Sequence, residues 1–423
     1  MIDINKIREN SQEIAKQLLK KGYEINFSEL LSLDKEKREL LTICENKKAN
    51  KNKVSTLIPV YKKEGKEVES VFLDMKKLGD EIVKLDQKIS IIDKKMNDIL
   101  FSLPNIPDND LVAGGKENNE VVKKVGKVPS FDFKIKDHVE LCEQLKLIDY
   151  ERGVKLAGSG HWIYKGMGAK LEWALLNFFI DEHLADGYEF MLLPHMLNYE
   201  CGFGAGQFPK FVDEVFWVDN KSENNKFLLP TAETALVNLY RNEIIKEENL
   251  PIKIFAYTPC YRREAGSYRT EERGMIRGYQ FNKVEMVQIT TPENSDKAFD
   301  ELLGKAEKIV EKLGLHFQVS KLAAGDCSAS MARTYDIEVW IPSMKIYKEV
   351  SSASNARDYQ ARRSNMRFRK DTKKPEFVHT LNASGLATSR IFPAIIEQYQ
   401  NADGSVTVPQ VLRKYMGGIT EIR

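Results

Sequence analysis

Arginine and glutamate side chains concentrate in one segment, CYRREAGSYRTEERGMIRGYQFNKVEM, which spans residues 260–286. Arginine binds phosphate and carboxylate groups through paired hydrogen bonds, so a cluster of arginines is suited to an anionic substrate. The runs at its two ends, KIFAYTPCYR and YQFNKVEMVQIT, have the composition of β-strands. The segment is therefore either a solvated, salt-bridged hairpin or a site built to hold anions. Its arginines are Arg262, Arg263, Arg269, Arg273 and Arg277.

Side chains alternate between the two faces of a strand, which places several of these groups together. Arg262 and Glu264 point the same way on the first run. Phe281, Lys283 and Glu285 point the same way on the second. If the two strands pair antiparallel, one sheet face gathers an arginine, two glutamates and an aromatic ring. The ring could stack on a base, and a glutamate could accept a hydrogen bond from an amino or hydroxyl group.

Two later stretches offer further groups that suit a phosphate. In IYKEVSSASN, Glu349 lies beside Ser351 and Ser352, and these hard oxygen ligands are of the kind that a Mg²⁺–phosphate complex uses. In LNASGLATSRIFPAIIEQYQ, a turn of small residues leads into an apolar helix with Arg390 near its start, which is a reasonable phosphate site. Pro393 indicates a kink or a restart in that helix.

The elements that must position these groups are short strands separated irregularly by helices. This order predicts a mixed domain around a mainly antiparallel sheet, and LEWALLNFFIDEHLADG predicts a buried helix that ends at Gly187. Neither a dinucleotide-binding glycine motif nor a P-loop is present.

The first hundred residues have a different pattern, with apolar residues alternating three and four apart from Val68 to Leu103, which is typical of a coiled-coil seam. The same spacing continues less perfectly upstream, from Leu30 to Tyr61. Pro59 should kink or end the first helix, and Glu64-Gly65-Lys66 supplies a turn. We expect a projecting antiparallel hairpin about 37 residues long per helix, or roughly 55 Å. It ends at LPNIPDND, residues 103–110.

Such an arm is either a dimerisation or spacer element or a contact for a large partner. The run NKKANKNK, residues 46–53, favours a partner weakly, because lysines suit phosphate contacts that give affinity without reading sequence. The candidate lysines are Lys47, Lys48, Lys51 and Lys53.

Composition narrows the class of protein. The formal net charge is only +2, so any nucleic-acid binding must rest on local basic patches. The five cysteines form no CxxC pair, which argues against a zinc site and a disulfide framework. A polar N-terminus and the lack of a long apolar span predict a cytoplasmic protein that does not bind a membrane.

The ordered motifs together resemble the bacterial type of seryl-tRNA synthetase, a class II aminoacyl-tRNA synthetase of protein biosynthesis, over nearly the whole chain. They are LPNIP, GYEFMLLP, GAGQFPKF, the TAE of LLPTAETALVN, YRREAGS, IRGYQFNKVEM, DIEVWIP, KEVSSASN, the QARR of DYQARRSNMRFR, and LNASGLATSR. The resemblance implies an α+β fold, with a tRNA-binding helical hairpin in residues 1–110 (coiled coil about 27–103) and a class II catalytic domain in residues 111–423. It also implies a homodimer.

The resemblance assigns roles to individual residues. Arg262 would bind the ATP α-phosphate and the serine carboxylate, Phe281 would stack on adenine, and Arg390 would meet the γ-phosphate. Glu349 and Ser352 would hold Mg²⁺ through ATP, and no zinc is expected. The loop from Gly266 to Ile276 would face the tRNA acceptor end. The ATP site would also include Arg263, Glu264, Val350 and Ser351, with Arg262, Glu264 and Arg390 catalytic; the serine site would hold Thr231, Ala232, Glu233, Arg262, Glu285, Asn382 and Ser384.

The implied reaction joins serine to tRNA(Ser), and to tRNA(Sec) where that exists, by way of seryl-adenylate. The arm would grip the long variable arm of the tRNA. The chain departs mildly from the family pattern: Asn282 replaces the usual aspartate, Ala353 and Ala356 replace cysteines, and Leu193 replaces a proline. Ala383 replaces a glycine beside the serine pocket, where it could tighten that pocket or alter its response to a serine analogue.

Two other functions are compatible with parts of the sequence. A relative that loads an amino acid onto a carrier protein would share the catalytic half but lack the long arm. An inactive regulator, or an RNA-binding scaffold, would tend to lose the phosphate arginines or the metal carboxylate, whereas Arg262, Glu349 and Arg390 are all present.

Overall fold

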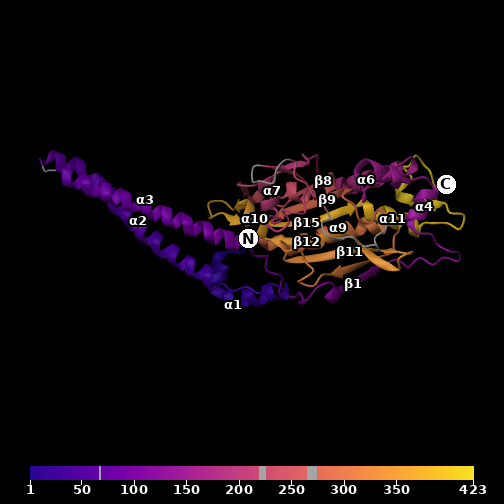
Figure 1. The fold of residues 1–423 in the computed structure, drawn as a ribbon, viewed down its shortest axis with the longest axis horizontal. Coiled ribbons are helices and arrows are strands. Elements are labelled where there is room, and N and C mark those ends of the chain that lie inside the picture. The colour runs from indigo at the N-terminus through magenta and orange to yellow at the C-terminus, as the bar shows by residue number, and fades with distance from the viewer. Residues whose placement is uncertain (66–67, 219–224, 264–273) are drawn as a thin grey trace. The chain divides into compact units, whose positions relative to one another are not determined.

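The computed structural model describes residues 1–65, 68–218, 225–263 and 274–423, and Figure 1 labels the main elements. The chain forms two compact units. The arm unit contains Ile2–Lys16 and Glu24–Pro104, and the sheet unit contains Met1, Gln17–Tyr23 and Asn105–Arg423. In the described residues, no helix combines the length and the apolar character needed to cross a bilayer.

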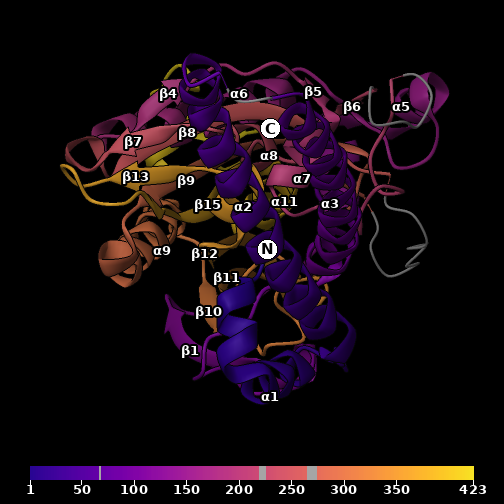
Figure 2. The ribbon, with the colours of Figure 1, turned by 90° about the vertical axis from the view of Figure 1, so that its left-hand side faces the viewer.

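The arm unit contains α1 (Ile4–Lys20) up to Lys16, together with α2 (Ser28–Lys63) and α3 (Glu69–Ser102). The helices α2 and α3 lie side by side and antiparallel, as Figure 2 shows, with Cys44, Ile82 and Ile89 buried between them. The predicted helical hairpin is thus confirmed. The first long helix continues through Pro59 for one more turn, because a proline removes only one backbone hydrogen bond there.

Ion pairs fix the register of the hairpin where lysines interrupt its apolar seam. Lys47 Nζ lies 2.7 Å from Glu81 Oε2, Lys48 Nζ lies 2.8 Å from Asp86 Oδ1, and Lys37 pairs with Asp93. Exposed pairs of this kind contribute only about 0.2–1 kcal/mol each, so the apolar seam supplies most of the stability and the charges select the alignment.

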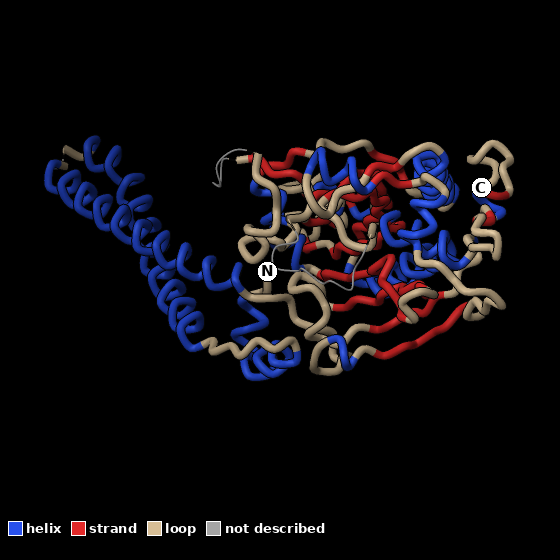
Figure 3. Tube along the Cα trace, turned by 45° about the vertical axis from the view of Figure 1, so that its right-hand side comes forward, coloured by secondary structure: helices blue, strands red, loops and turns tan. Residues whose placement is uncertain are grey.

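An eight-stranded sheet forms the centre of the sheet unit, in the order β1-β10-β11-β12-β15-β9-β8-β4. Neighbouring strands run antiparallel except β4 and β8, so the predicted mainly antiparallel sheet is confirmed. Figure 3 shows the strands in red, with helices in blue around them. In chain order its strands are β1 (Glu120–Val125), β4 (Glu189–Met191), β8 (Ile252–Tyr261), β9 (Gln280–Thr290), β10 (Phe317–Lys321), β11 (Arg333–Ile341), β12 (Ile346–Arg357) and β15 (His379–Ala387).

Three helices bury one apolar side each against this sheet: α6 (Met167–Ala185), α9 (Ser295–Lys312) and α11 (Thr388–Gln398). In α9 the buried residues Ala298, Phe299, Leu302 and Ala306 recur three and four apart, which gives one continuous apolar stripe. The predicted buried helix is α6, which ends two residues before Gly187. Pro393 lies inside α11 without ending it.

Shorter elements complete the unit and carry several site residues. The helices are α4 (His138–Gln144), α5 (Tyr150–Ala157), α7 (Tyr199–Gly204), α8 (Glu233–Leu236) and α10 (Tyr359–Ser364). The strands are β2 (Ile148–Asp149), β3 (Ile163–Tyr164), β5 (Met196–Asn198), β6 (Lys226–Leu228), β7 (Ile244–Lys246), β13 (Arg367–Arg369), β14 (Glu376–Phe377), β16 (Val406–Thr407) and β17 (Glu421–Ile422).

The loop between β10 and β11 is held by two segments that lead into the arm unit along the chain. Lys21 Nζ donates to the carbonyls of Ser328 at 3.0 Å and Met331 at 2.6 Å. Asn105 Nδ2 donates to the carbonyl of Ser330 at 2.9 Å. The segments before and after the arm therefore fix the same loop.

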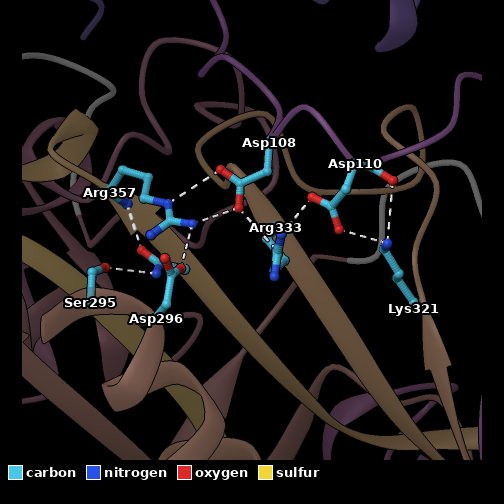
Figure 4. Close-up of polar contacts among 8 residues, drawn as sticks. Asp108, Asp110, Ser295, Asp296, Lys321, Arg333 and Arg357 are labelled. Carbon is cyan, nitrogen blue, oxygen red and sulfur yellow. Dashed lines mark hydrogen bonds and ion pairs between the residues drawn. The ribbon is translucent and has the colours of Figure 1, made fainter. Parts of the chain in front are cut away.

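An ion-pair network continues this attachment, as Figure 4 shows. Asp108 Oδ2 lies 2.7 Å from Arg357 Nη2 and 2.9 Å from Arg333 Nε. Arg357 Nη2 also lies 2.7 Å from Asp296 on α9, and Asp110 pairs with Lys321. The network joins the segment after the arm to three strands and one helix of the sheet unit.

Candidate active site

The central strands of the sheet carry the polar residues of the site on one face. In β9, Phe281 is paired with Cys260 of β8, and Glu285 is paired with Ser384 of β15. The alternation along β9 then brings Phe281, Lys283 and Glu285 to the same face, as predicted. A cavity of about 540 Å³ opens over this face, lined by Thr231, Glu233, Arg262, Lys283, Glu285, Asp336, Glu349, Ser352, Asn382 and Ser384, among others.

Lys283 and Glu285, which both line this cavity, form a buried ion pair. The Glu285 side chain is fully buried and pairs with Lys283, whose Nζ also donates to Thr231 Oγ1 at 2.8 Å. Asn382 Nδ2 donates to Glu285 Oε1 at 3.0 Å. A buried carboxylate needs such partners to remain charged. Glu285 is thus held ready to accept a hydrogen bond from a small polar ligand.

A second buried carboxylate, Glu233, begins the short helix α8. Its Oε1 accepts from Gln360 Nε2 at 2.8 Å, and its backbone N–H donates to Thr231 Oγ1 at 3.2 Å. Burial raises the pKa of the Glu233 carboxyl to about 7, and the nearby Glu285 adds to this increase. Two acidic groups with different partners therefore face the same cavity.

The two predicted phosphate arginines line a smaller adjoining cavity of about 90 Å³, together with Phe281 and Val350. Arg390 Nη1 donates to the Glu349 carbonyl at 2.8 Å, and the guanidinium of Arg262 lies 5.2 Å from the centre of the Phe281 ring. Arg262 and Glu349 line both cavities. The aromatic ring, the cationic groups and the two buried carboxylates therefore line two adjoining cavities that share part of their walls.

The oxygen atoms of Glu349 and Ser352 fit a divalent cation. Burial would raise the pKa of Glu349, but Arg390 and Arg262 outweigh this effect and hold the pKa below its ordinary value. Ser352 Oγ lies 3.3 Å from Glu349 Oε1 and also bonds to Asp336. Magnesium prefers one or two carboxylates plus phosphate oxygens, which matches this small donor set. Among the described residues, no group of three or more His, Cys, Asp or Glu side chains is arranged to hold a metal ion.

Some predicted residues do not line either cavity. Arg263 is exposed, and its Nη1 lies 3.5 Å from the Asp213 carbonyl. Ala232 is buried, and Ser351 Oγ donates to the Ser384 carbonyl at 2.6 Å. Ala383 belongs to the hydrophobic core on the opposite face of β15, so the expectation that it tightens the serine pocket is wrong. Glu264, and most of the loop predicted to face the tRNA acceptor end, lie outside the described residues.

The structure adds three polar residues for which the sequence predicted no role: Lys283, Gln360 and Asp336. Strand alternation already placed Lys283 beside Glu285, so its pairing could have been anticipated. Gln360 lies on α10 and reaches Glu233 only through tertiary packing. Burial, together with Glu349, raises the pKa of Asp336 well above its ordinary value, and Asp336 accepts from Ser352.

Two family profiles match the chain in different parts. Residues 1–107 match the seryl-tRNA synthetase N-terminal domain, and residues 216–399 match the tRNA synthetase class II core domain (G, H, P, S and T). Among curated relatives, Serine--tRNA ligase 2 of Clostridium acetobutylicum is 62% identical, covering 99% of both chains. Serine--tRNA ligase of Carboxydothermus hydrogenoformans is 45% identical, covering 99% of this chain and 98% of the relative.

Solved structures agree with these matches. A seryl-tRNA synthetase from Pyrococcus horikoshii, complexed with ATP, superimposes with a TM-score of 0.92 at 32% identity, covering 100% of this chain and 99% of the other. A cytoplasmic serine–tRNA ligase from Naegleria fowleri, in complex with AMP, gives 0.88 at 27% identity, covering 100% and 99%. The protein is therefore a member of the seryl-tRNA synthetase family, a family of ligases within class II of the aminoacyl-tRNA synthetases.

Proposed function

We propose that the protein activates L-serine with ATP to seryl-adenylate and pyrophosphate, and then transfers serine to the 3′ end of tRNA(Ser), and of tRNA(Sec) where that tRNA exists. The observation that carries this proposal is that two adjoining cavities share Arg262, Lys283, Glu349 and Ser384 as lining residues. Buried Glu233 and Glu285 suit the amino and hydroxyl groups of serine, while Arg262, Phe281 and Arg390 beside them suit a nucleoside triphosphate. The two structural relatives described above carry ATP or AMP.

In the first step the serine carboxylate attacks the α-phosphorus, and pyrophosphate leaves. Arg262 would hold the carboxylate and the α-phosphate together, and Arg390 would bind the γ-phosphate. No covalent bond to the protein forms, so these residues act by positioning the reactants and stabilising negative charge. Bound Mg²⁺, held by Glu349 and Ser352, would neutralise part of the charge on the phosphates.

Glu285 would select serine against amino acids that lack a hydroxyl group. Its carboxylate is fully buried, and Lys283 and Asn382 already bond to it from within the protein. When alanine occupies the site, the position that the serine hydroxyl should fill offers no donor. Because Lys283 and Asn382 keep Glu285 bonded when alanine is present, we expect discrimination of about a hundredfold, below the factors on the order of 10⁴ that arise where a buried group is left unpaired.

In the second step a hydroxyl of the terminal adenosine of tRNA attacks the acyl carbon, and AMP leaves. We propose that Lys47, Lys48, Lys51 and Lys53 contact tRNA phosphates, with the arm recognising the long variable arm by shape. Lys47 and Lys48 already pair with acidic residues of α3, so their contribution would require sharing or exchange of those partners. A homodimer and a cytoplasmic location are part of the same proposal, and rest on the family resemblance.

The test is serine-dependent exchange of pyrophosphate into ATP, without tRNA and with alanine, threonine and cysteine as comparison substrates. We expect exchange with serine alone. The Glu285→Ala variant should raise the serine requirement by about a hundredfold or more, and the ATP requirement far less, because serine is the only one of the two substrates proposed to contact that carboxylate. Folded wild-type protein that catalyses no exchange with any amino acid would contradict the proposal and favour an inactive regulator.

A protein that loads a carrier protein would also pass the exchange test, so a second assay is needed. Such a protein would not charge tRNA, whereas this one should transfer serine to tRNA(Ser). The N-terminal family match over residues 1–107 favours the tRNA substrate.

A further inference from the structure

The carboxylate of Glu172 is buried against β9, the strand that carries Phe281, on the sheet face away from the two cavities. Glu172 belongs to α6, its side chain is 3% exposed, and it lines neither cavity. The reaction described above does not use it. In the described part of the chain no arginine or lysine pairs with it, although an unpaired buried carboxylate is costly and an apolar residue would pack there at lower cost.

One oxygen of Glu172 connects two segments that are far apart in sequence. Its Oε1 accepts from Asn282 Nδ2 of β9 at 2.8 Å and from Thr388 Oγ1, at the start of α11, at 2.5 Å. Asn282 Oδ1 in turn accepts from the Tyr257 hydroxyl of β8 at 3.2 Å. The carboxylate therefore joins three elements of the fold at one point.

Both hydrogen-bond donors are close neighbours of groups that face the ATP cavity. Asn282 lies between Phe281 and Lys283 and points the opposite way, because side chains alternate along a strand. Thr388 precedes Arg390 by two residues in the first turn of α11. Holding Asn282 and Thr388 from behind therefore fixes the backbone that carries the Phe281 ring and the Arg390 guanidinium.

We propose that Glu172 is a positioning residue for ATP, which holds the adenine-binding end of β9 and the phosphate-binding start of α11 at a fixed separation. This inference rests on the proposed function, since it assumes that Phe281 and Arg390 bind ATP. Glu233 and Glu285, on the serine side of the site, have other partners, although Lys283, which is next to Asn282 and pairs with Glu285, connects them to this segment. The loss of Glu172 should therefore affect ATP more than serine.

The raised pKa of Glu172 indicates that its hydrogen bonds, and not its negative charge, hold the two segments in place. Burial raises its pKa to about 7, against the opposing effects of Thr388 and Asn282. Its oxygen can accept both hydrogen bonds in the ionised and in the protonated form. A glutamine, which keeps an acceptor oxygen in the same position, should therefore replace it.

The experiment measures the Michaelis constants for ATP and serine in pyrophosphate exchange, for the wild type and the variants Glu172→Ala and Glu172→Gln. We expect the alanine variant to raise the ATP constant about tenfold and to leave the serine constant within about twofold. The glutamine variant should restore the ATP constant to within about threefold of the wild type. The matched control is Thr290→Val. Thr290 is a buried threonine on β9, the strand that carries Asn282, and its replacement should change neither constant beyond about twofold.

Three results would overturn the inference: an unchanged ATP constant in Glu172→Ala, an equal rise in both constants, or failure of glutamine to restore ATP binding. Should Glu172→Ala not fold, Thr388→Val removes one donor while keeping the shape of the side chain. That variant should raise the ATP constant alone, by about threefold, and an unchanged constant there counts against the proposal. Absence of exchange in the wild type would instead contradict the proposed function.

Discussion

Four glutamates of the sheet unit show how the surroundings of a carboxyl group change its charge and its partners. Glu285 pairs with Lys283 inside the protein, whereas Glu349 faces two arginines that lower its pKa. Glu172 and Glu233 have neutral hydrogen-bond donors, and burial raises the pKa of each to about 7. The same side chain is thereby suited to reading a hydroxyl group, holding a cation, fixing two backbone segments or attracting an ammonium group.

The raised pKa of Glu233 predicts that serine binding depends on pH. Above about pH 7 this carboxyl is ionised and attracts the serine ammonium group, whereas below its pKa it is protonated and the attraction is lost. The Michaelis constant for serine in pyrophosphate exchange should therefore rise as the pH falls from 8 to 6, by at most about tenfold per unit. The measurement is that constant at saturating ATP over this range.

The control for this pH dependence is Glu233→Gln, which cannot titrate. It should bind serine weakly at every pH and lose most of the dependence. If the variant kept the wild-type pH profile, another group would be responsible, and the assignment of Glu233 to the amino group would be wrong.

At the residue scale, the sequence predicted the groups that lie on regular strands. Alternation along β9 placed Phe281 and Glu285 on one face, and the structure places them there. The position of Gln360 could not be predicted, because α10 meets Glu233 only after the chain has folded. Ala383 was expected to tighten the serine pocket, but its neighbours Asn382 and Ser384 line the cavity. Because side chains alternate along the strand, Ala383 faces the hydrophobic core instead.

At the scale of elements, the loop between β10 and β11 links the arm connections to the cavity. Ser328, Ser330 and Met331 line the larger cavity, and their carbonyls accept from Lys21 and Asn105. Burial lowers the pKa of Lys21 to about 8, yet two carbonyl acceptors hold its ammonium group in place. Lys21 and Asn105, which lie just before and just after the α2–α3 hairpin in sequence, therefore hold one wall of the larger cavity in place.

The ion-pair network beside this loop should stabilise the sheet unit through Asp108. Its side chain is 16% exposed and contacts both Arg333 and Arg357, so Asp108→Ala leaves two half-buried guanidinium groups without this partner. We expect the free energy of unfolding to fall by about 2 kcal/mol. Urea unfolding of the variant and the wild type measures this change.

The matched control is Asp110→Ala in the same segment, whose carboxylate is 48% exposed and pairs with Lys321 and Arg333. A more exposed pair should contribute less than about 1 kcal/mol. If the free energy of unfolding fell equally in the two variants, Asp108 would contribute no more to stability than the more exposed Asp110.

Periodicity made the long elements predictable. The three-four spacing predicted α2 and α3, and the apolar run after residue 170 predicted α6. The sequence already suggested that β8 pairs with β9. The rest of the strand order could not be predicted, since β1 pairs with β10 and β9 pairs with β15 through contacts between distant segments. Local spacing reports which face of an element is buried but does not say which neighbour covers it.

At the scale of the whole molecule, the two units divide the proposed reaction between them. The residues proposed to bind ATP and serine belong to the sheet unit, and the lysines proposed to contact tRNA belong to the arm unit. Activation of serine should therefore be separable from transfer to tRNA, because the first step involves none of the arm residues.

Shortening the arm tests this separation. A short glycine-rich linker in place of residues 48–80 keeps the Lys47–Glu81 and Lys37–Asp93 pairs and the seam residues Cys44, Ile82 and Ile89, so the remaining hairpin has its native register. We expect serine-dependent pyrophosphate exchange within about twofold of the wild type. The kcat/KM for charging tRNA(Ser) should fall about a hundredfold, which corresponds to a loss of about 3 kcal/mol of binding free energy.

A matched variant keeps the arm at full length and replaces Lys51 and Lys53 by alanine. It should weaken charging by a smaller factor and reduce the dependence of the tRNA Michaelis constant on salt, because fewer phosphate contacts release fewer counterions. Unchanged charging by the shortened protein would exclude the arm as a tRNA contact. An equal loss of exchange and charging would show instead that the catalytic site needs the arm in order to form. The proposal that the sheet unit alone activates serine would then be wrong.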